Sequence, residues 1–337
     1  MRIVICTDAW HPQVNGVVTT LNHTREALRA LGHEVTVIGP DAFANLPLPG
    51  YPEIRLALLP YRRLRRRLDA LRADCIHIAT EGPVGWAARR YCRQRGLRFN
   101  TSYHTQFPEY VHARYPFVPL GLGYALMRRF HRPAAHTLVA TGHMERLLRD
   151  KGFRHLVRWG RGVDTACFRP RPDAPAELAQ LPRPLWVYAG RLAVEKNLPA
   201  FLALKLPGSK LVIGDGPARR ELQARFTEAH FVGYRFGEEL ASYLAAGDVF
   251  VFPSRTDTFG LVMLEALACG LPVAAFPVTG PLDVLRQGET GCLHDDLRQA
   301  CLDALALSAE ACRRQAEETS WEACTKQFLA ALVSNSA

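Results

Sequence analysis

Residues 253–281 of the chain, PSRTDTFGLVMLEALACGLPVAAFPVTGP, follow the unbroken apolar run at 249–252. A short apolar run without polar alternation is typical of a strand buried on both faces, as in a parallel sheet. Polar residues after Pro253 predict a loop. Gly260 is expected to open a helix that ends near Cys269, where a glycine and a proline follow. The next apolar run predicts another strand, so the stretch indicates a strand–loop–helix–strand unit of a parallel α/β sheet.

Two carboxylates, Asp257 and Glu265, lie on either side of this predicted helix N-terminus. The first N–H groups of a helix have no intrahelical partner and the helix dipole is positive there, so the place suits an anion. Helical rise separates the two carboxylates by about 10 Å, a span that reaches from a sugar, past a diphosphate, to a ribose. The alternative is that Asp257 only caps the helix and Glu265 is a solvated side chain.

The spacing of Asp257 and Glu265, with a Phe-Gly pair between them, resembles the Glu-x7-Glu signature of family-4 retaining glycosyltransferases, which have the GT-B fold. The resemblance extends over nearly the whole chain, from the Asn-Gly-Val turn at 15–17 to the segment around Trp321, and is closest to bacterial α-mannosyltransferase-like and glycolipid-forming members. The first acid is Asp instead of Glu. Because Asp-Thr-Phe-Gly versions also belong to the family, this departure concerns the donor sugar more than the activity.

Length and composition suit two domains, each able to bury a core. The chain has 337 residues, of which 48% are hydrophobic and 22% charged. The resemblance implies two Rossmann-like, doubly wound α/β domains that face each other across a cleft. Five prolines among residues 169–184 predict a stiff connection between them. We therefore expect an acceptor-binding domain of residues 1–168 plus 318–337, and a nucleotide-sugar domain of residues 169–317.

Cysteine usage and hydropathy indicate a cytoplasmic protein. The nine cysteines are scattered, their number is odd and none forms Cys-x2-Cys, which favours free thiols in a reducing compartment over disulfides or zinc. The N-terminus does not resemble a signal peptide, and no apolar run approaches the roughly 20 residues that span a bilayer. A peripheral location on the inner face of the cell membrane is the alternative.

The positive charge is concentrated in the N-terminal half. The net charge is +10, and twelve arginines stand against three acids between Arg55 and Arg98. Such an excess predicts an acidic partner: anionic lipid, a phosphate-bearing substrate or nucleic acid. Residues 61–71 predict a basic amphipathic helix, which either lies at a membrane interface or is an ordinary surface helix. The apolar positions of this helix are Tyr61, Leu64, Leu68 and Leu71.

The first half repeats a strand, a loop and a helix. The predicted strands are 3–6, 35–38, 75–79, 98–101, 136–140 and 156–159. Gly16 begins the first helix, where a glycine lets a bound group approach the backbone or simply makes a turn. His104 follows the fourth strand, where α/β proteins bind ligands, although a lone histidine is more often structural. Residues 107–124, with three prolines, are expected to be irregular.

The second half restarts the same rhythm with strands at 185–189 and 210–213. Arg191 and Lys196 flank the loop after the first of these, at the same sheet edge as Asp257. Two cations there can neutralise a leaving diphosphate, or they can be solvated loop residues. The Gly-Asp-Gly-Pro turn after the second strand does not complete a dinucleotide-binding motif, because Arg219 stands where the third glycine belongs.

The resemblance assigns roles to these residues. It implies that Arg191 and Lys196 contact the diphosphate, that Asp257 and His104 face the transferred sugar, and that Asn15 and Tyr103 lie on the acceptor side. The residues expected to bind the donor are Gly16, Gly214, Gly216, Gly233, Tyr234, Phe259, Gly260, Leu261, Val262 and Glu265. No metal is expected, because the chain has no Asp-x-Asp pair, and no cofactor is expected.

The function implied is transfer of a hexose, with retention of configuration, to a hydroxyl of a membrane lipid or lipid-linked acceptor. GDP-mannose is the first expectation for the donor and a UDP-hexose or UDP-uronic acid the second. A non-hydrolysing sugar-nucleotide epimerase of the same fold is the main alternative. A pyridoxal-dependent phosphorylase-like enzyme and a nucleic-acid-binding module are others, although no nucleic-acid-binding motif is present and no such partner is expected.

Overall fold

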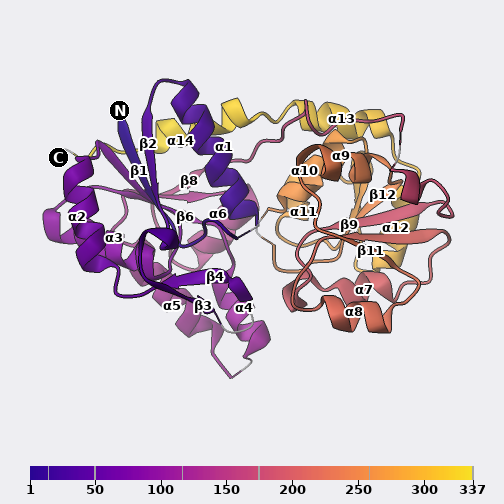
Figure 1. Ribbon diagram of the computed structural model, residues 1–337, viewed down its shortest axis with the longest axis horizontal. Coiled ribbons are helices and arrows are strands. Elements are labelled where there is room, and N and C mark those ends of the chain that lie inside the picture. Colours follow the sequence, from indigo (N-terminus) through magenta and orange to yellow (C-terminus); the bar gives the residue numbers. More distant parts are fainter. Residues whose placement is uncertain (14, 49–50, 116, 174, 258, 336–337) are drawn as a thin grey trace. The chain divides into compact units, whose positions relative to one another are not determined.

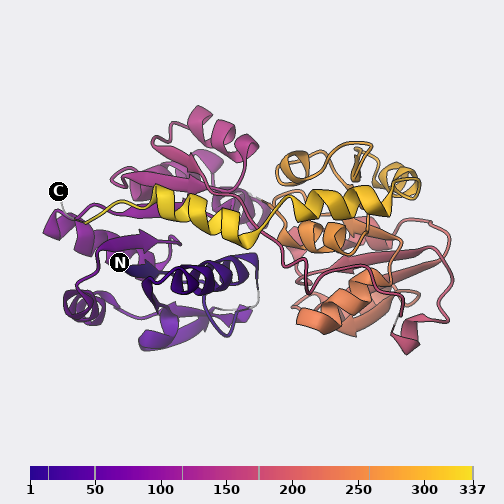
Figure 2. The same ribbon diagram turned by 90° about the horizontal axis from the view of Figure 1, so that it is seen from above.

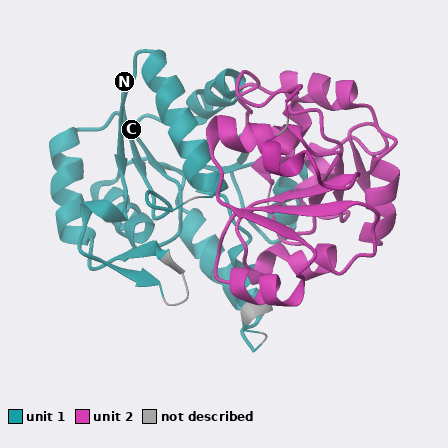
Figure 3. Cartoon of the chain, turned by 45° about the vertical axis from the view of Figure 1, so that its right-hand side comes forward, with its two compact units in different colours: residues 1–160, 321–337 teal, residues 161–320 magenta. Residues whose placement is uncertain are grey.

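The computed structural model describes residues 1–13, 15–48, 51–115, 117–173, 175–257 and 259–335. The chain forms two compact units (Figure 3). Unit 1 contains Met1–Gly160 and Trp321–Ala337, and unit 2 contains Arg161–Ser320. The first boundary between the units, after Gly160, therefore lies eight residues before the boundary expected after residue 168. The second boundary, after Ser320, lies three residues beyond the one expected after residue 317.

Unit 1 is built on a parallel sheet of six strands in the order β2-β1-β5-β6-β7-β8. The strands are β1 Arg2–Cys6, β2 Glu34–Ile38, β5 Cys75–Ile78, β6 Asn100–Tyr103, β7 His136–Val139 and β8 Leu156–Arg158. All six were expected, but β6 begins two residues later than predicted. Arg98 is exposed, whereas Asn100 is buried and pairs with His77 and His136 on the neighbouring strands.

Helices cover both faces of this sheet (Figures 1 and 2). They are α1 Gly16–Ala30, α2 Tyr61–Leu71, α3 Pro83–Arg95, α4 Phe107–Arg114, α5 Leu120–His131, α6 Gly142–Asp150 and α14 Trp321–Ala331. Alternate residues of β1 point to opposite faces: Ile3 and Ile5 pack with α1 and α14, whereas Val4 packs with α2 and α3. A short 3-10 helix, Pro40–Ala42, and an antiparallel hairpin complete the unit. The hairpin pairs β3 Asn45–Leu48 with β4 Tyr51–Ala57.

Helix α2 has the predicted bounds, and its apolar side faces the protein. Leu64 and Leu68 are buried in the core shared with α3, whereas the five arginines of the helix are all exposed. Because these leucines are already covered, the helix cannot lay them into a membrane interface. The structure therefore favours the ordinary surface helix of the two alternatives for residues 61–71.

Residues 107–124 are not irregular, and that prediction was wrong. They form α4 and the first five residues of α5, and two of the three prolines stand where helices tolerate them; Pro116 lies outside the described residues. Pro108 lies in the first turn of α4 and Pro119 is the residue before α5. A backbone N–H at such positions has no intrahelical acceptor, so its loss costs no helical hydrogen bond.

The C-terminal helix α14 belongs to unit 1, in which Phe328 packs against Trp159. Buried Asn100 fixes the end of this helix. Its Nδ2 donates to the Ala331 carbonyl at 2.7 Å, and its Oδ1 accepts from the Val333 N–H at 3.0 Å. His136 makes a further bond to the same Ala331 carbonyl, at 2.8 Å.

Unit 2 is also built on a parallel sheet, in the order β11-β10-β9-β12-β13-β14. The strands are β9 Leu185–Ala189, β10 Ser209–Ile213, β11 His230–Gly233, β12 Val249–Phe252, β13 Val273–Ala275 and β14 Gly291–Leu293. Counted within the unit, this is the Rossmann order 3-2-1-4-5-6. The order reverses between β9 and β12, which is where ligands bind in such folds.

The helices of unit 2 pack on both faces of its sheet. They are α7 Leu198–Leu202, α8 Arg219–Arg225, α9 Gly237–Ala245, α10 Leu261–Ala268, α11 Pro281–Val284, α12 Leu297–Ala304 and α13 Ala309–Glu317, with 3-10 helices at Ala176–Leu178 and Val194–Lys196. In the described part of the chain, no helix of either unit is both long and apolar enough to cross a bilayer. All nine cysteines are free thiols.

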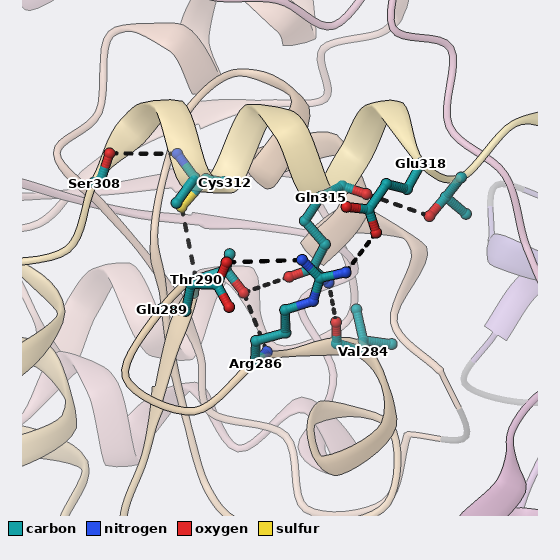
Figure 4. Close-up of polar contacts among 10 residues, drawn as sticks. Val284, Arg286, Glu289, Thr290, Ser308, Cys312, Gln315 and Glu318 are labelled. Carbon is teal, nitrogen blue, oxygen red and sulfur yellow. Dashed lines mark hydrogen bonds and ion pairs between the residues drawn. The ribbon is translucent and has the colours of Figure 1, made fainter.

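Both ends of unit 2 are held by local contacts, which explains where the units divide. Val163 and Phe168 belong to the core of unit 2, and the Arg313 guanidinium donates to the Phe168 carbonyl at 2.7 Å. At the other end, Figure 4 shows Gln315 of α13 between two partners: its side chain hydrogen-bonds the Thr290 hydroxyl and the Val284 carbonyl. The segment before the proline-rich stretch and the end of α13 are thus both part of unit 2.

Replacing Asn100 by alanine should destabilise unit 1 by about 1–3 kcal/mol, because the buried Val333 N–H loses the acceptor that Asn100 supplies. Urea denaturation followed by tryptophan fluorescence measures the change. Lys326→Ala, at an exposed position of α14, is the control and should change the free energy of unfolding by less than about 0.5 kcal/mol. Equal effects of the two substitutions would mean that Asn100 does not hold the end of α14.

Candidate active site

The loops that follow β9, β10 and β11 are joined by backbone hydrogen bonds at the carboxyl edge of the unit 2 sheet. Gly190 N–H donates to Ile213 at 2.9 Å, and Gly214 N–H donates to Gly233 at 2.8 Å. Leu192 N–H donates to the Asp215 carbonyl at 2.9 Å. These bonds hold Gly214 and Gly233, two of the predicted donor-binding glycines, and their neighbours in one fixed framework.

Gly214 and Gly216 have a steric reason to be glycine. A Cβ atom at Gly214 would lie 2.0 Å from the Gly190 carbonyl oxygen, and one at Gly216 would lie 2.4 Å from that of Leu192. Both residues also have φ in the region that side chains disfavour, at +132° and +158°. The close approach of the loops therefore requires these glycines, whether or not a nucleotide is bound.

Lys196 and Asp257 meet across the point where the strand order reverses. The Lys196 Nζ lies 2.7 Å from Asp257 Oδ1 and 2.8 Å from Oδ2, and the two side chains are only 22% and 14% exposed. Asn197 Nδ2 donates to the Pro253 carbonyl at 3.1 Å beside this ion pair. The loop after β9 is thus tied to the loop after β12, and a cation and a carboxylate are fixed at the sheet edge.

The helix that follows this loop begins without a side-chain cap. Gly260 precedes α10 in the left-handed conformation, with φ +83°, and among the described residues α10 has no side-chain capping hydrogen bond. Leu261 and Val262 form the first turn, and Phe259 packs against the core of unit 2. Thr258 lies outside the described residues. The N-terminus of α10 thus keeps the anion-binding character expected from the sequence.

Glu265 lies in the second turn of α10 and is half-buried. Burial among apolar atoms raises the pKa of its carboxyl to about 7. Within the described residues, no group hydrogen-bonds this carboxyl. Near neutral pH it therefore exists in both protonation states, and a ligand that hydrogen-bonds the ionised form can shift the balance.

The remaining donor-side residues cluster beside the glycine loops. Arg191 is half-buried in the loop after β9, and its carbonyl accepts a hydrogen bond from the Tyr188 hydroxyl at 2.9 Å. The Tyr234 hydroxyl donates to the Asp215 carbonyl at 3.1 Å, and its ring stacks on Phe236 with centroids 5.7 Å apart. Both of these rings remain partly exposed.

In unit 1, Asn15 is the N-cap of α1. Its Oδ1 accepts from the N–H groups of Val17 and Val18, each at 3.0 Å, and Gly16 is the first helical residue. Val14 lies outside the described residues. The cap explains why asparagine stands before this helix, and the roles of Asn15 and Gly16 in binding substrates stay predictions.

His104 and Tyr103 differ in their surroundings although they are neighbours. His104 follows β6 at the carboxyl edge of the sheet, 7% exposed, with its ring edge-on to Trp159 at 5.6 Å. Tyr103 is 1% exposed and packs in the core with Phe153, and burial raises the pKa of its hydroxyl. As the chain is folded here, His104 lies where a ligand binds to such a sheet, whereas Tyr103 is covered by protein.

Sequence reasoning missed two acids that shape these edges. Asp8 accepts from the N–H groups of Val84 and Gly85 at 2.7 and 3.1 Å and so caps α3, although burial still raises its pKa to about 6. Asp215 accepts from Arg219 Nη1 at 2.6 Å within the glycine loop. An acid two residues after a buried strand was the available signal in both places. Across the described ranges, no three acidic, histidine or cysteine side chains converge as a metal site requires.

Two Rossmann-type sheets in one chain, the second with a fixed cation beside an uncapped helix N-terminus, are the architecture of GT-B glycosyltransferases. Residues 14–166 match Glycosyltransferase Family 4, and residues 183–308 match the family described as Glycosyl transferases group 1. The GDP-mannose-dependent alpha-mannosyltransferase of Mycobacterium tuberculosis is 32% identical over 318 residues, which cover 87% of this chain and 83% of that protein. The chain therefore belongs to glycosyltransferase family 4.

A further relative agrees with this assignment, and a solved structure shows the same fold. The alpha-monoglucosyldiacylglycerol synthase of Acholeplasma laidlawii is 27% identical over 316 residues, covering 81% of this chain and 79% of that protein. The structure of sucrose-phosphate synthase from Thermosynechococcus elongatus has a TM-score of 0.79 at 22% identity, over 98% of this chain and 97% of that one. The expected GT-B fold and glycosyltransferase activity are thus confirmed.

Gly214→Ala should disrupt unit 2 far more than Gly237→Ala. Both glycines have positive φ, but only the first has a backbone atom where the Cβ would go. Gly237→Ala should cost about 1 kcal/mol of stability, and Gly214→Ala about 3 kcal/mol or more. Thermal unfolding of the two variants measures the difference, and similar melting temperatures would show that the loops can separate.

Proposed function

We propose that the enzyme transfers a hexose from a nucleoside-diphosphate sugar to a hydroxyl of a membrane lipid or lipid-linked acceptor, with retention of configuration. The observation that carries the donor class is the Lys196–Asp257 pair, with Nζ–O distances of 2.7 and 2.8 Å, beside the uncapped N-terminus of α10. GDP-mannose is the first candidate donor because the relative from M. tuberculosis is described as GDP-mannose-dependent. The relative that forms a glucosyldiacylglycerol supports a lipid acceptor.

The diphosphate is the group that the N-terminus of α10 suits best. In this proposal the N–H groups of Leu261 and Val262 donate to it, and Lys196 and Arg191 balance its charge. Asp257 already compensates the lysine, so the cation is held in place before a ligand arrives. Negative charge grows on the diphosphate as the sugar leaves, and fixed positive groups stabilise that charge more than they stabilise the bound donor.

The nucleoside and the sugar then extend in opposite directions from the diphosphate. Glu265 would accept hydrogen bonds from the ribose hydroxyls, and the loops of Gly214, Gly216 and Gly233 with the Tyr234 ring would border the base. Asp257 and His104 would face the transferred sugar, and Gly16 the phosphate. Asn15 and Tyr103 are proposed for the acceptor side, and Tyr103 would act there only through the residues that cover it.

Retention requires that the new bond form on the face from which the diphosphate departs. We infer a front-face transfer: the acceptor oxygen bonds to the anomeric carbon as the bond from that carbon to the diphosphate breaks. The departing phosphate oxygen takes the proton of the acceptor hydroxyl, so no base from the protein is consumed. In this proposal the enzyme is cytoplasmic and associates peripherally with the membrane. The free thiols of all nine cysteines accord with a reducing compartment.

A panel of nucleoside diphosphates tests the donor. GDP at 100 times its dissociation constant should stabilise the protein by about 2.7 kcal/mol, with a smaller effect of UDP, ADP and CDP. Thermal shift measures the rank order, and radiolabelled transfer to lipid extracts then tests the reaction. Preference for UDP would move the donor to a UDP-hexose, and a sugar nucleotide that rearranges without an acceptor would favour the epimerase.

Lys196→Ala should lower kcat about 100- to 1000-fold, as expected when one group that stabilises developing charge is removed. Steady-state transfer assays measure the loss, and Lys326→Ala, on the exposed side of α14, should leave the rate unchanged. Near-normal turnover of Lys196→Ala in a folded protein would contradict the role assigned to this lysine.

GDP should bind about tenfold more tightly at pH 8 than at pH 6. The pKa of Glu265 is about 7 in the free protein, so most of the carboxyl gains its charge, and its capacity to accept two hydroxyls, within this interval. Titration calorimetry of the wild type and of Glu265→Gln measures the effect, which the variant should lack. A pH-independent wild type would remove Glu265 from the ribose.

The same pKa predicts the stability of the ligand-free protein. The folded-state value lies above the ordinary value of 4.5, so the folded state holds the proton more tightly than the unfolded chain does. The stability that the folded state gains from the protonated Glu265 carboxyl is therefore fully present below pH 4.5, and it is lost as the pH rises to about 7. Glu265→Gln should be more stable than the wild type at pH 8 in urea denaturation, although it binds GDP less well.

A further inference from the structure

Helices α4 and α5 of unit 1 and the segment between them expose several large apolar side chains, which the sequence did not lead us to expect. Residues 115–127, YPFVPLGLGYALM, contain no charged residue. Phe117 is 82% exposed, Leu122 64% and Leu126 45%, and Phe107 at the start of α4 is 49% exposed. We call these four residues the apolar tip. Scattered exposed leucines need no explanation, but a contiguous set of this kind marks a surface that binds something.

The apolar tip is part of a well-packed structure. A Cβ atom at Gly123 of α5 would lie 2.8 Å from Pro108 of α4, so the two helices are in close contact. His112 Nδ1 lies 2.8 Å from the Val118 carbonyl across their connection, and the Tyr124 hydroxyl hydrogen-bonds Glu109. The exposure therefore belongs to the folded hairpin, which in Figure 1 extends from the lower edge of unit 1.

A hollow of about 140 Å³ opens between the two helices beside the apolar tip. Its walls are apolar, and include Pro108, Val111, Val118 and Met127 as well as Phe107, Leu122 and Leu126 of the apolar tip. No charged residue lines it among the described residues. Such a surface suits hydrocarbon and offers nothing to a sugar or a phosphate.

Basic residues follow directly behind the apolar tip. Arg129 and Arg132 are exposed at the C-terminal end of α5, and Arg128 donates from Nη1 to the Lys151 carbonyl at 2.9 Å, which places a lysine of the same sign nearby. Leu126 and Arg129 are one helical turn apart, about 4.5 Å along the axis. Apolar residues at the end of a hairpin with cations one turn behind match the hydrocarbon boundary and the anionic headgroups of a lipid leaflet.

We propose that the α4–α5 hairpin is the membrane-docking element of this enzyme: the apolar tip enters the interface of an anionic bilayer, and the arginines behind it contact the headgroups. The inference rests on the proposed lipid acceptor and names the surface through which the enzyme reaches it. Helix α2 is less suited to insertion because Leu64 and Leu68 are covered. A second copy of the chain is disfavoured as the occupant, because two such hairpins would bring like charges together.

The test uses the whole chain and vesicles of phosphatidylcholine with about 30% phosphatidylglycerol. This fraction of anionic lipid gives the vesicles a negative surface potential of the order found on biological membranes. The triple variant Phe117→Ser, Leu122→Ser, Leu126→Ser should bind these vesicles about tenfold more weakly than the wild type in co-sedimentation. The matched control is Leu31→Ser, Leu46→Ser, Leu59→Ser, three exposed leucines elsewhere in unit 1, and it should bind like the wild type.

A second pair of variants separates charge from apolar contact. Arg129→Gln with Arg132→Gln should lower binding to the anionic vesicles and leave the weak binding to pure phosphatidylcholine unchanged. Equal losses in the two leucine-containing triple variants, or wild-type binding by the α4–α5 variant, would overturn the proposal. So would self-association of the lipid-free protein that the α4–α5 substitutions abolish, because the surface would then bind a second copy.

The proposed function can fail independently of this inference. GDP stabilisation and hydrolysis of the donor in the absence of acceptor should be the same in the wild type and the α4–α5 triple variant, because the substitutions lie outside unit 2. Vesicle binding that depends on the apolar tip, without any transfer to lipid, would support the docking surface and contradict the lipid acceptor. Transfer to vesicle lipids that the triple variant performs at the wild-type rate would contradict the docking surface alone.

Discussion

The ion pair between Lys196 and Asp257 is the contact on which the donor side of this enzyme depends. It joins the loops after β9 and β12, the two strands at which the sheet order of unit 2 reverses. A half-buried charge is costly without a partner, so each residue holds the other at the sheet edge. The pair lies just before α10, and it therefore fixes a cation, a carboxylate and a helix N-terminus within one small region. In the proposed function, an incoming diphosphate would therefore meet positive groups that need no rearrangement of the loops.

The glycines of unit 2 serve the same arrangement from the other side. Gly214 and Gly216 let the loop after β10 pass against the loop that carries Arg191 and Lys196, at distances that any side chain would obstruct. The framework is thus set by backbone contacts, and the charged side chains are carried on it. In the proposed function, this division would let residues at the open end of the framework vary with the donor while the loops remain in place.

Much of this could be predicted from the sequence, and the failures have physical causes. The buried strands and α10 were found because parallel strands read as apolar runs and helices end at glycine and proline. The structure of α4 and α5 was missed because prolines were counted as breakers, although Pro108 and Pro119 stand at helix starts. The Lys196–Asp257 pair joins residues 61 positions apart, and no local pattern reports such a contact. Burial of Tyr103 was equally invisible, because the residues that cover it come from α5 and α6.

Two half-buried carboxyls, Asp8 and Glu265, contrast a structural acid with one proposed to bind a ligand. Burial raises the pKa of both, Asp8 to about 6 and Glu265 to about 7. The oxygens of Asp8 accept from two N–H groups of α3 and from Thr80, so its hydrogen-bonding capacity is used within the protein. Glu265 carries the same desolvation with no such compensation among the described residues. A group that lowers stability in this way persists where function requires it, and hydroxyls of a bound nucleoside would supply the hydrogen bonds that the protein does not.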